Sequence, residues 1–317
     1  TEAVVVAAEK CAEDTKGQTC FICTQALHWK TKEGLVRGCS CRGTAGIAHV
    51  SCLVEQAKIL CDEAEENNLG HNVLDKRFHR WDTCGLCEQD YHGVVSCALG
   101  WACWKTYLGR AETDKARRYA MSVLGNGLHD AQHYEEALFV REAELCMERR
   151  LGDSVSRILG VQGNLALVYQ RLGRFEQSLR IERDVYRGYL KLGGQEHEQT
   201  LQAANNYADL LKNLNRFEEA KALLRKMMPV ARRVLGENHE ITLKIRWARA
   251  RTPFQDPGAT LDELREAMTT LAETERIARR VFGGENPFTV GVETFVRNAR
   301  DTLAAREGDD LSSVCDG

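Results

Sequence analysis

The sequence predicts a mainly α-helical protein with two parts, a small cysteine-rich region followed by a solenoid of helical repeats. Two observations support this prediction. Eleven of the 13 cysteines fall before residue 104, and several of them form closely spaced pairs. From about residue 117 onward, helix-forming segments of similar sequence recur at a spacing of 42 residues. A period of this length is typical of stacked helical pairs, each too small to bury its own apolar face.

Composition limits the class of protein. The chain has 317 residues, 43% of them hydrophobic, and a formal net charge of −3, which gives no support for general nucleic-acid binding. No apolar run approaches the ~20 residues that a membrane-spanning helix needs. The N-terminal "TEAVVVAAEK" does not resemble a secretory signal, although an anchor outside this chain would not be visible. Cys-x-x-Cys pairs without such a signal are typical of metal ligands in a reducing compartment, so we expect a cytoplasmic protein.

The sequence changes character along its length, which suggests a domain organisation. Paired cysteines and Gly-containing loops precede a broadly apolar segment, "VVSCALGWACWKTYLG", that is expected to form a linking helix. The repeats follow this segment. We expect an N-terminal tail at 1–19, a cysteine-rich finger at 20–93, a linking helix at 94–116, the solenoid with a capping helix at 117–305, and a mobile tail at 306–317.

The repeat has landmarks that can be measured. Spacings of 42, 42 and 47 residues separate the glycines that end the units, Gly152, Gly194, Gly236 and Gly283. Within a unit, one small residue lies 12 positions before another, as Ala166 does before Ser178 and Ala208 before Ala220. Small residues at such positions allow two helices to pack closely. The fourth unit departs from this pattern, because Pro253 and a five-residue insertion predict a bent or interrupted first helix.

This pattern of small and large residues resembles the tetratricopeptide repeat. The unit length and the "G-x2-H-x2-TL" connector resemble the repeats of kinesin light chains. The resemblance implies a concave surface, formed by the first helix of each unit, that binds a protein or peptide ligand. A solvated polar face without a ligand is the alternative. The residues expected on or near this surface are Asn126, His129, Asn164, Arg171, Asn205, Asn206, Lys212 and Asn213.

Eight potential metal ligands occur in four pairs. In chain order they are Cys20, Cys23, Cys39, Cys41, His49, Cys52, Cys84 and Cys87. Four pairs of such ligands are what two tetrahedral zinc sites require, and thiolate with imidazole favours zinc over calcium or magnesium. We therefore expect two structural Zn²⁺ ions and no catalytic metal, because no coordination position is left open. Free buried cysteines are the alternative, but they would not occur in four ordered pairs.

The ligand order, with Cys-x-Cys as the second pair and His-x-x-Cys as the third, resembles the RING-CH finger over residues 20–87. The resemblance implies a cross-brace, in which the first and third pairs hold one zinc ion and the second and fourth pairs hold the other. The first ion would be held by Cys20, Cys23, His49 and Cys52, and the second by Cys39, Cys41, Cys84 and Cys87. A plant homeodomain finger has the same ligand order, but it usually carries a tryptophan two residues before its final pair. Here Trp81 lies three residues before that pair.

The RING-CH resemblance implies a ubiquitin ligase. Such a finger recruits a charged ubiquitin-conjugating enzyme and positions its thioester, without a catalytic residue or covalent intermediate of its own. The resemblance implies contact with that enzyme through Ile22 and Leu53, and packing around the zinc loops is the alternative for both. Glu88 departs from the pattern, because active fingers often carry a basic residue after the last cysteine. The alternative function is a non-catalytic zinc-binding scaffold of tetratricopeptide repeats for protein–protein interaction.

Other cysteines and tryptophans are not expected to bind metal. The cysteines without a partner at ligand spacing are Cys11, Cys61, Cys97, Cys103 and Cys146, and we expect them in the core or half-exposed on helices. Trp81, Trp101 and Trp104 are expected to join the finger to the linking helix, because large aromatic side chains dominate such contacts. A peptide pocket is the alternative for these tryptophans.

Overall fold

The computed structural model describes the backbone of residues 2–41 and 43–315, and the side chains of these residues except 71 and 309–315. In this part of the chain nearly all regular structure is helical, and the β pairings are two isolated bridges, Val36 with Ala48 and Thr83 with Asp90. The prediction of a mainly α-helical chain is confirmed. The chain divides into two compact units, Thr1–Asp153 and Ser154–Gly317.

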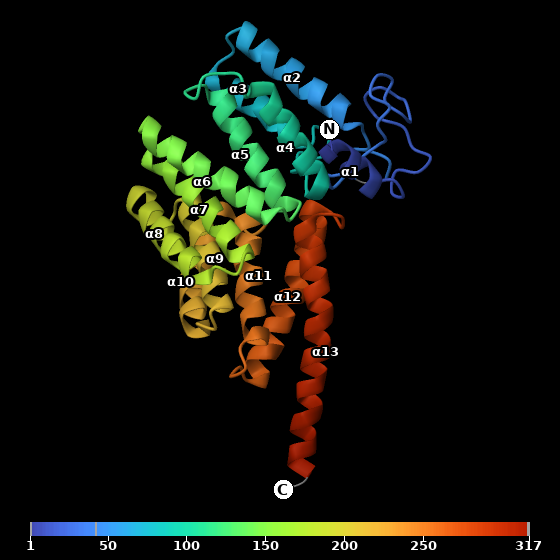
Figure 1. Ribbon diagram of the computed structural model, residues 1–317. Helices are drawn as coiled ribbons and strands as arrows, with labels where there is room; N and C mark the ends of the chain where they lie inside the picture. Colours follow the sequence, from blue (N-terminus) through green and yellow to red (C-terminus); the bar gives the residue numbers. More distant parts are fainter. Residues whose placement is uncertain (1, 42, 316–317) are drawn as a thin grey trace. The chain divides into compact units, whose positions relative to one another are not determined.

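The first unit contains the cysteine-rich loops and the helices around them (Figure 1). Helix α1 (Glu2–Lys10) precedes the loops. Helix α2 (Val50–Glu66) begins at the third ligand pair and contains Cys52, and α3 (His71–Phe78) and the 3₁₀ helix η1 (His79–Trp81) lie between α2 and the fourth pair. Helix α4 (Gly93–Tyr107) then packs along α5 (Lys115–Asp130), which pairs with α6 (Tyr134–Leu151). The finger, α4 and the first helical pair therefore form one compact body.

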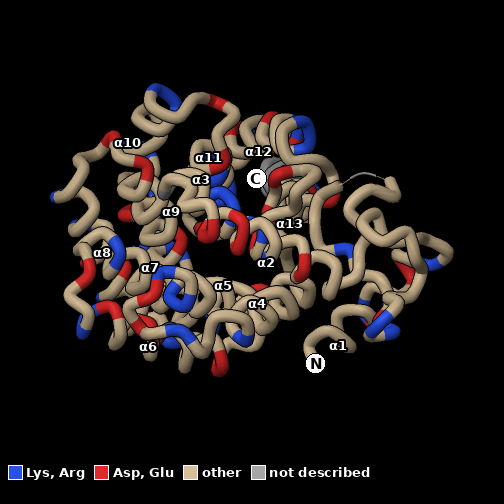
Figure 2. The backbone as a smooth tube through the Cα atoms, turned by 90° about the horizontal axis from the view of Figure 1, so that it is seen from above, with Lys and Arg blue, Asp and Glu red and all other residues tan. Residues whose placement is uncertain are grey.

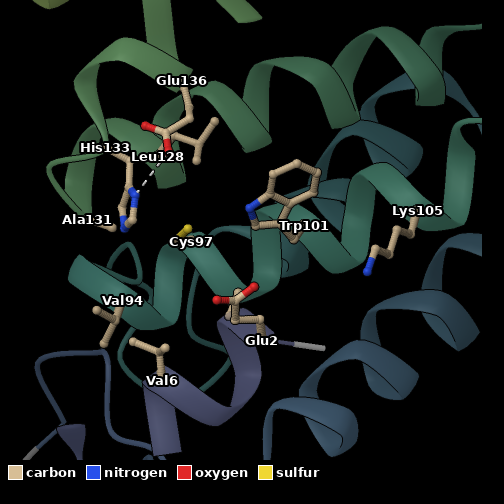
Figure 3. Close-up of a pocket in the computed structure, with 11 residues that line it drawn as sticks. Glu2, Val6, Val94, Cys97, Trp101, Lys105, Leu128, Ala131, His133 and Glu136 are labelled. Atoms are coloured by element: carbon tan, nitrogen blue, oxygen red, sulfur yellow. Dashed lines mark ion pairs between the residues drawn. The ribbon is translucent and has the colours of Figure 1, made fainter.

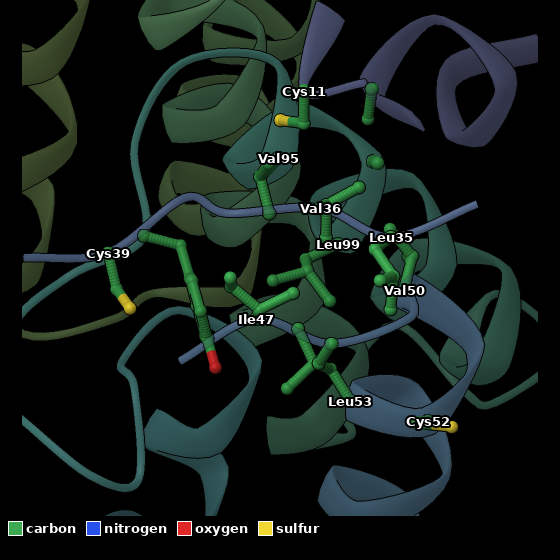
Figure 4. Close-up of a cluster of buried hydrophobic side chains, with 14 of the residues drawn as sticks. Cys11, Leu35, Val36, Cys39, Ile47, Val50, Cys52, Leu53, Val95 and Leu99 are labelled. Atoms are coloured by element: carbon green, nitrogen blue, oxygen red, sulfur yellow. The ribbon is translucent and has the colours of Figure 1, made fainter. Parts of the chain in front are cut away.

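An apolar core lies among the cysteine loops (Figure 4). Val36 and Ile47 from the loops are each 1% exposed, and they belong to the same buried cluster as Leu53 of α2 and Leu99 of α4. Fully buried Ala7 of α1 joins this cluster. The cysteine-rich loops are thus held by apolar packing from α1, α2 and α4.

The second unit consists of three helical pairs and one long helix. The pairs are α7 (Val155–Arg171) with α8 (Phe175–Gly193), α9 (Glu198–Asn213) with α10 (Phe217–Leu235), and α11 (Glu240–Gln255) with α12 (Leu261–Phe282), and α13 (Pro287–Cys315) packs on α12. Residues of both charge signs are interspersed along α8 and α10 (Figure 2), as is usual for solvated helix faces. Small residues bring the paired helices together: Ala166, Ala208 and Ala220 are fully buried, and Ser178 Oγ donates a hydrogen bond of 2.8 Å to the Ala166 carbonyl oxygen.

The second helix of each pair has one equivalent buried position, and the type of residue at this position changes from pair to pair. It lies four residues after the small residue of that helix and is at most 1% exposed; its occupants are Arg141, Glu182, Leu224 and Leu271. Arg141 donates a hydrogen bond of 2.6 Å to Glu144. Neither carboxyl oxygen of Glu182 has a hydrogen-bond partner among the described atoms. Burial, followed by the nearby Asp209, raises the pKa of Glu182 to about 8, so this side chain is largely protonated at neutral pH.

The structure corrects three expectations about helices. The segment expected as an N-terminal tail contains α1, which packs on α4. The last helix continues to Cys315 rather than Ala305, so it includes most of the segment expected to be a mobile tail; residues 316–317 lie outside the described residues. Pro253 does not interrupt α11, because it falls in the last turn, where the helix is about to end.

Candidate metal centres and repeat surface

The structure brings together Cys20, Cys23, His49 and Cys52, whose ligand atoms all lie within 4.8 Å of one another. These are the four residues that the RING-CH resemblance assigns to one ion. The Nδ1 atom of His49 lies 3.4 Å from Cys23 Sγ and 3.7 Å from Cys52 Sγ, while Nε2 lies 3.4 Å from the carbonyl oxygen of Ala26. A metal-binding histidine commonly donates its second ring N–H to such an oxygen, which fixes its tautomer. The ring is therefore oriented to bind a metal through Nδ1.

The second group contains only cysteines, and a glycine lies directly against it. The ligand atoms of Cys39, Cys41, Cys84 and Cys87 also lie within 4.8 Å of one another. A Cβ atom at Gly46 would meet Cys39 Sγ at 2.6 Å and Cys41 Cβ at 2.8 Å, and the φ angle there is +76°. Glycine is the residue that fits both the contact and the left-handed backbone. The loop can therefore pass close to the sulfur atoms.

The two Cys-x-x-Cys turns have the same local geometry. The backbone N–H of Ile22 donates to Cys20 Sγ over 3.4 Å, and that of Leu86 donates to Cys84 Sγ over 3.4 Å. The residue after each turn has a left-handed backbone, with φ of 62° after the first turn and 56° after the second. Because N–H donation stabilises a negatively charged sulfur, both turns are suited to hold metal-bound thiolates.

The clustered thiols of the second group cannot all ionise at neutral pH without a cation. Hydrogen bonds, above all from Cys39, lower the pKa of Cys84 to about 4. Burial, with further contributions from Cys87 and Cys84, raises the pKa of Cys41 to about 12, although the hydrogen bond with Cys39 opposes this shift. The hydrogen bond with Cys84 is also the main reason that the pKa of Cys39 is raised. A divalent ion would remove the repulsion between thiolates, so the donor chemistry of both groups fits a bound metal ion. The two groups could each bind one.

The two residues expected to contact a conjugating enzyme differ in solvent exposure. Ile22 lies in the first Cys-x-x-Cys turn and is 36% exposed. Leu53 is only 4% exposed and lies in the core cluster of the finger, so the expected contact through Leu53 is corrected. Trp29 and Leu86, which the sequence did not single out, are 69% and 53% exposed. Their apolar character in loops was the available signal, but sequence alone does not tell an exposed loop residue from a buried one.

The residues expected on the peptide-binding surface of the second unit differ in accessibility. Arg171 and Asn213 are exposed, and Asn164 and Asn206 are half-buried. The remaining two, Asn205 and Lys212, are only 6% and 3% exposed. The Nζ atom of Lys212 lies 2.5 Å from Asp209 Oδ1 in an ion pair, so its expected role as a ligand contact is corrected.

In the first unit, the expected surface residues are engaged with neighbouring side chains. Asn126 is exposed, and its Oδ1 atom accepts a hydrogen bond from the buried guanidinium of Arg141. His129 is half-buried, with Nδ1 3.7 Å from Asp130 Oδ1. These contacts orient both side chains.

A charged network that the sequence did not single out joins α9 to α11. Arg251 Nη2 donates a hydrogen bond of 2.9 Å to Asp209 Oδ1, and its guanidinium lies 4.5 Å from the centre of the Trp247 ring. Although burial opposes ionisation, Lys212 and Arg251 hold the pKa of Asp209 below its usual value. Asp209 and Arg251 are 42 residues apart. The repeat period itself was therefore the signal that could have found this pair.

The match to a family model supports the repeats. Residues 157–233 match the tetratricopeptide-repeat family. Among solved structures, the nearly identical TPR-like repeats of a kinesin-light-chain protein from Podosopora anserina share 17% identity, cover 73% of this chain and 97% of that chain, and give a TM-score of 0.44. BtubC (BKLC) from P. vanneervenii shares 14% identity, with 82% and 92% coverage and a TM-score of 0.40. The apo form of RapI shares 11% identity, with 81% and 84% coverage and a TM-score of 0.47. A comparison with curated proteins gives no match.

The chain therefore carries tetratricopeptide repeats, which form a scaffold for protein–protein interaction. In the described part of the chain, no helix combines the length and apolar character needed to cross a bilayer.

Proposed function

We propose that this protein is a ubiquitin ligase of RING-CH type, in which the finger holds two structural Zn²⁺ ions and the repeats bind the protein substrate. The observation that carries the proposal is the sorting of eight ligands into two groups that combine the first pair with the third and the second with the fourth. That sorting is the cross-brace of the resembling family. Sets of Cys₃His and Cys₄ without a carboxylate favour zinc.

The finger would act by positioning and not by chemistry of its own. Ile22 projects from the first Cys-x-x-Cys turn and is partly exposed, as a contact with a conjugating enzyme requires. Its backbone N–H donates to Cys20 Sγ, so the turn fixes the backbone of this residue beside the first group of ligands. A rigid contact can hold the thioester-linked ubiquitin in a reactive orientation, which lowers the entropic part of the barrier.

Autoubiquitination assayed with a panel of conjugating enzymes tests the proposal. We expect activity with at least one enzyme, and a loss of roughly tenfold or more in Ile22→Ala because one central apolar contact is removed. Val73→Ala is the matched control, since Val73 is 42% exposed on α3, away from the ligand pairs. Two Zn²⁺ ions per chain should be retained in both variants. No activity at full zinc content contradicts the ligase.

A zinc-binding scaffold without ligase activity is the second candidate, and Glu88 is the observation that favours it. This carboxylate follows the last ligand pair, where an arginine would donate hydrogen bonds to ubiquitin and an acid does not. If Glu88→Arg creates autoubiquitination where the natural sequence has none, the scaffold is supported. If both proteins are equally active, Glu88 has no bearing on transfer.

We further propose that the repeats bind an extended peptide through the accessible members of the expected set, Asn164, Arg171, Asn206 and Asn213. Amide side chains both donate and accept, as a peptide backbone requires. The described cysteines are all free thiols, which is consistent with the reducing cytoplasm that we propose as the location. A pull-down with the full chain, compared with Asn206→Ala, identifies the partner and tests this surface.

A further inference from the structure

The first unit carries a groove that neither the metal groups nor the repeat surface explains (Figure 3). Its volume is about 420 Å³, within the usual range for ligand pockets. One face of α4 forms the floor, because Val94, Cys97, Trp101 and Lys105 follow one another at helical spacing. Residues of α1 form one wall and residues from the end of α5 to the start of α6 form the other.

The groove is apolar at its floor and acidic on both walls. Val6 of α1 is 37% exposed and extends the apolar surface, and Trp101 is only partly buried. Glu2 projects from the α1 wall and Glu136 from the opposite wall, and both are exposed (Figure 3). The two carboxylates therefore lie on opposite walls of the groove.

Ionisable side chains in and around the groove determine the electrostatic potential at a bound ligand. His133 Nδ1 lies 3.6 Å from Glu136 Oε1 and offsets that carboxylate only when the imidazole is protonated. Lys105 lies at the far end of the floor, toward the C-terminus of α4. Burial, followed by Glu136 and Asp130, raises the pKa of the Cys97 thiol to about 11. The carboxylates thus produce a negative potential in the groove, which favours a cationic group.

We propose that this groove binds a basic, apolar peptide segment of a partner protein. A lysine or arginine of the segment lies between Glu2 and Glu136 with its charge over the indole of Trp101, where cation–π attraction adds to the two ion pairs. Leucine-like side chains of the segment pack on Val94 and Val6, which are both accessible in the groove. Phe139, three residues after Glu136 on α6 and 75% exposed, provides a further apolar contact beyond the groove. An acidic segment would place its carboxylates against those of the walls.

Calorimetric titration of the full chain with two probe peptides tests this site. One probe is a short Leu/Ala/Arg peptide, and the other is its twin with every arginine replaced by glutamate. We expect saturable, salt-sensitive binding of the arginine peptide alone, and a loss of affinity of roughly tenfold or more in Glu136→Lys, because an attraction becomes a repulsion. Glu135→Lys is the matched control: it changes net charge equally from an exposed position outside the groove lining, and it should alter affinity less than twofold.

The alternatives give different results. Equal weakening by Glu135→Lys and Glu136→Lys would mean attraction to net charge only and would overturn the proposal. Binding of the glutamate twin as tightly as the arginine peptide, or no binding of the arginine peptide, would also overturn it. Val94→Ala removes apolar surface from the floor without changing any charge, so it tests the apolar contact alone. If apolar contact contributes as proposed, this variant also weakens binding of the arginine peptide; if its affinity is unchanged, the apolar part of the proposal is wrong.

Discussion

The finger and the repeats of the second unit are stabilised by different interactions. In the finger, two groups of four ligands connect loops that carry little regular structure of their own, and a small apolar core lies among them. In the second unit, helices pack through small residues and buried leucines such as Leu224 and Leu271. The two donor groups therefore predict that the loops depend on a bound ion, whereas the helical pairs depend on the burial of apolar surface.

Each region contains one feature that departs from its own rule. The finger shares its apolar core with α1 and α4, so apolar packing also contributes to its stability. The second unit buries Glu182 at the position where later pairs place leucine. The apolar core of the finger and the buried Glu182 therefore give sharp tests of how each region is stabilised.

Removal of metal should have the largest effect. With a strong chelator, we expect the ligand-bearing loops at 20–52 and 84–91 to lose amide-exchange protection, because each structural site supplies on the order of 10 kcal/mol. Helices α7 to α12 should keep their protection, since the second unit contains neither ligand group. Hydrogen exchange read by mass spectrometry makes the measurement, and the chelator saturated with zinc is the control. Equal loss of protection in both regions contradicts the distinction.

Removal of one ligand should have the next largest effect. Cys84→Ala takes a sulfur from the all-cysteine group, and we expect its metal to be lost while the group that contains His49 keeps its own. The total metal content, measured by mass spectrometry, should fall from two ions to one. Cys146→Ala removes an exposed thiol outside both groups and should leave the content at two. An unchanged content in Cys84→Ala would show that this group holds no metal.

Local spacing predicted the parts of the structure that depend on short stretches of chain. The four ligand pairs are defined within a few residues each, and resemblance to a known finger supplied the way in which the pairs combine. The small residues Ala166 and Ser178 were recognisable for the same reason, since the repeat shows them more than once. The repeat period and the spacing within each ligand pair involve short stretches of chain, so both can be recognised in a single sequence.

Burial depends on residues that lie far apart in the chain, and sequence could not supply it. Leu53 follows a ligand directly, yet it is buried because loop residues and α4 complete the core above it. Lys212 has the residue type of a ligand contact, but Asp209 one turn earlier holds it in an ion pair. Helix α1 was missed because its short apolar run gains stability from α4, about 90 residues away in the chain.

The buried acid of the second unit should produce a measurable pH dependence. Burial raises the pKa of Glu182 from its ordinary value of 4.5 to about 8 in the folded chain, so the folded state binds more protons between these two pH values. Stability should therefore fall as pH rises from 4.5 to 8, by up to roughly 4–5 kcal/mol, and then level off. Glu182→Gln should remove this part of the slope. Chemical unfolding of the full chain at several pH values makes the comparison, and Glu176→Gln, an exposed site on the same helix, is the control. Identical slopes in all three proteins contradict the assignment.

The smallest effect should come from the glycine beside the all-cysteine group, where a matched control lies three residues away. Gly46 and Gly43 both have left-handed backbones, with φ of +76° and +61°. An added Cβ at Gly46 would lie 2.6 Å from Cys39 Sγ, whereas an added Cβ at Gly43 meets nothing within 4 Å. Both alanine variants should lose about 1 kcal/mol from backbone strain. Only Gly46→Ala should also weaken zinc binding, as measured by competition with a chromophoric chelator, because its methyl group displaces a ligand. Equal zinc affinity in the two variants would show that the close approach of the loop does not shape the site.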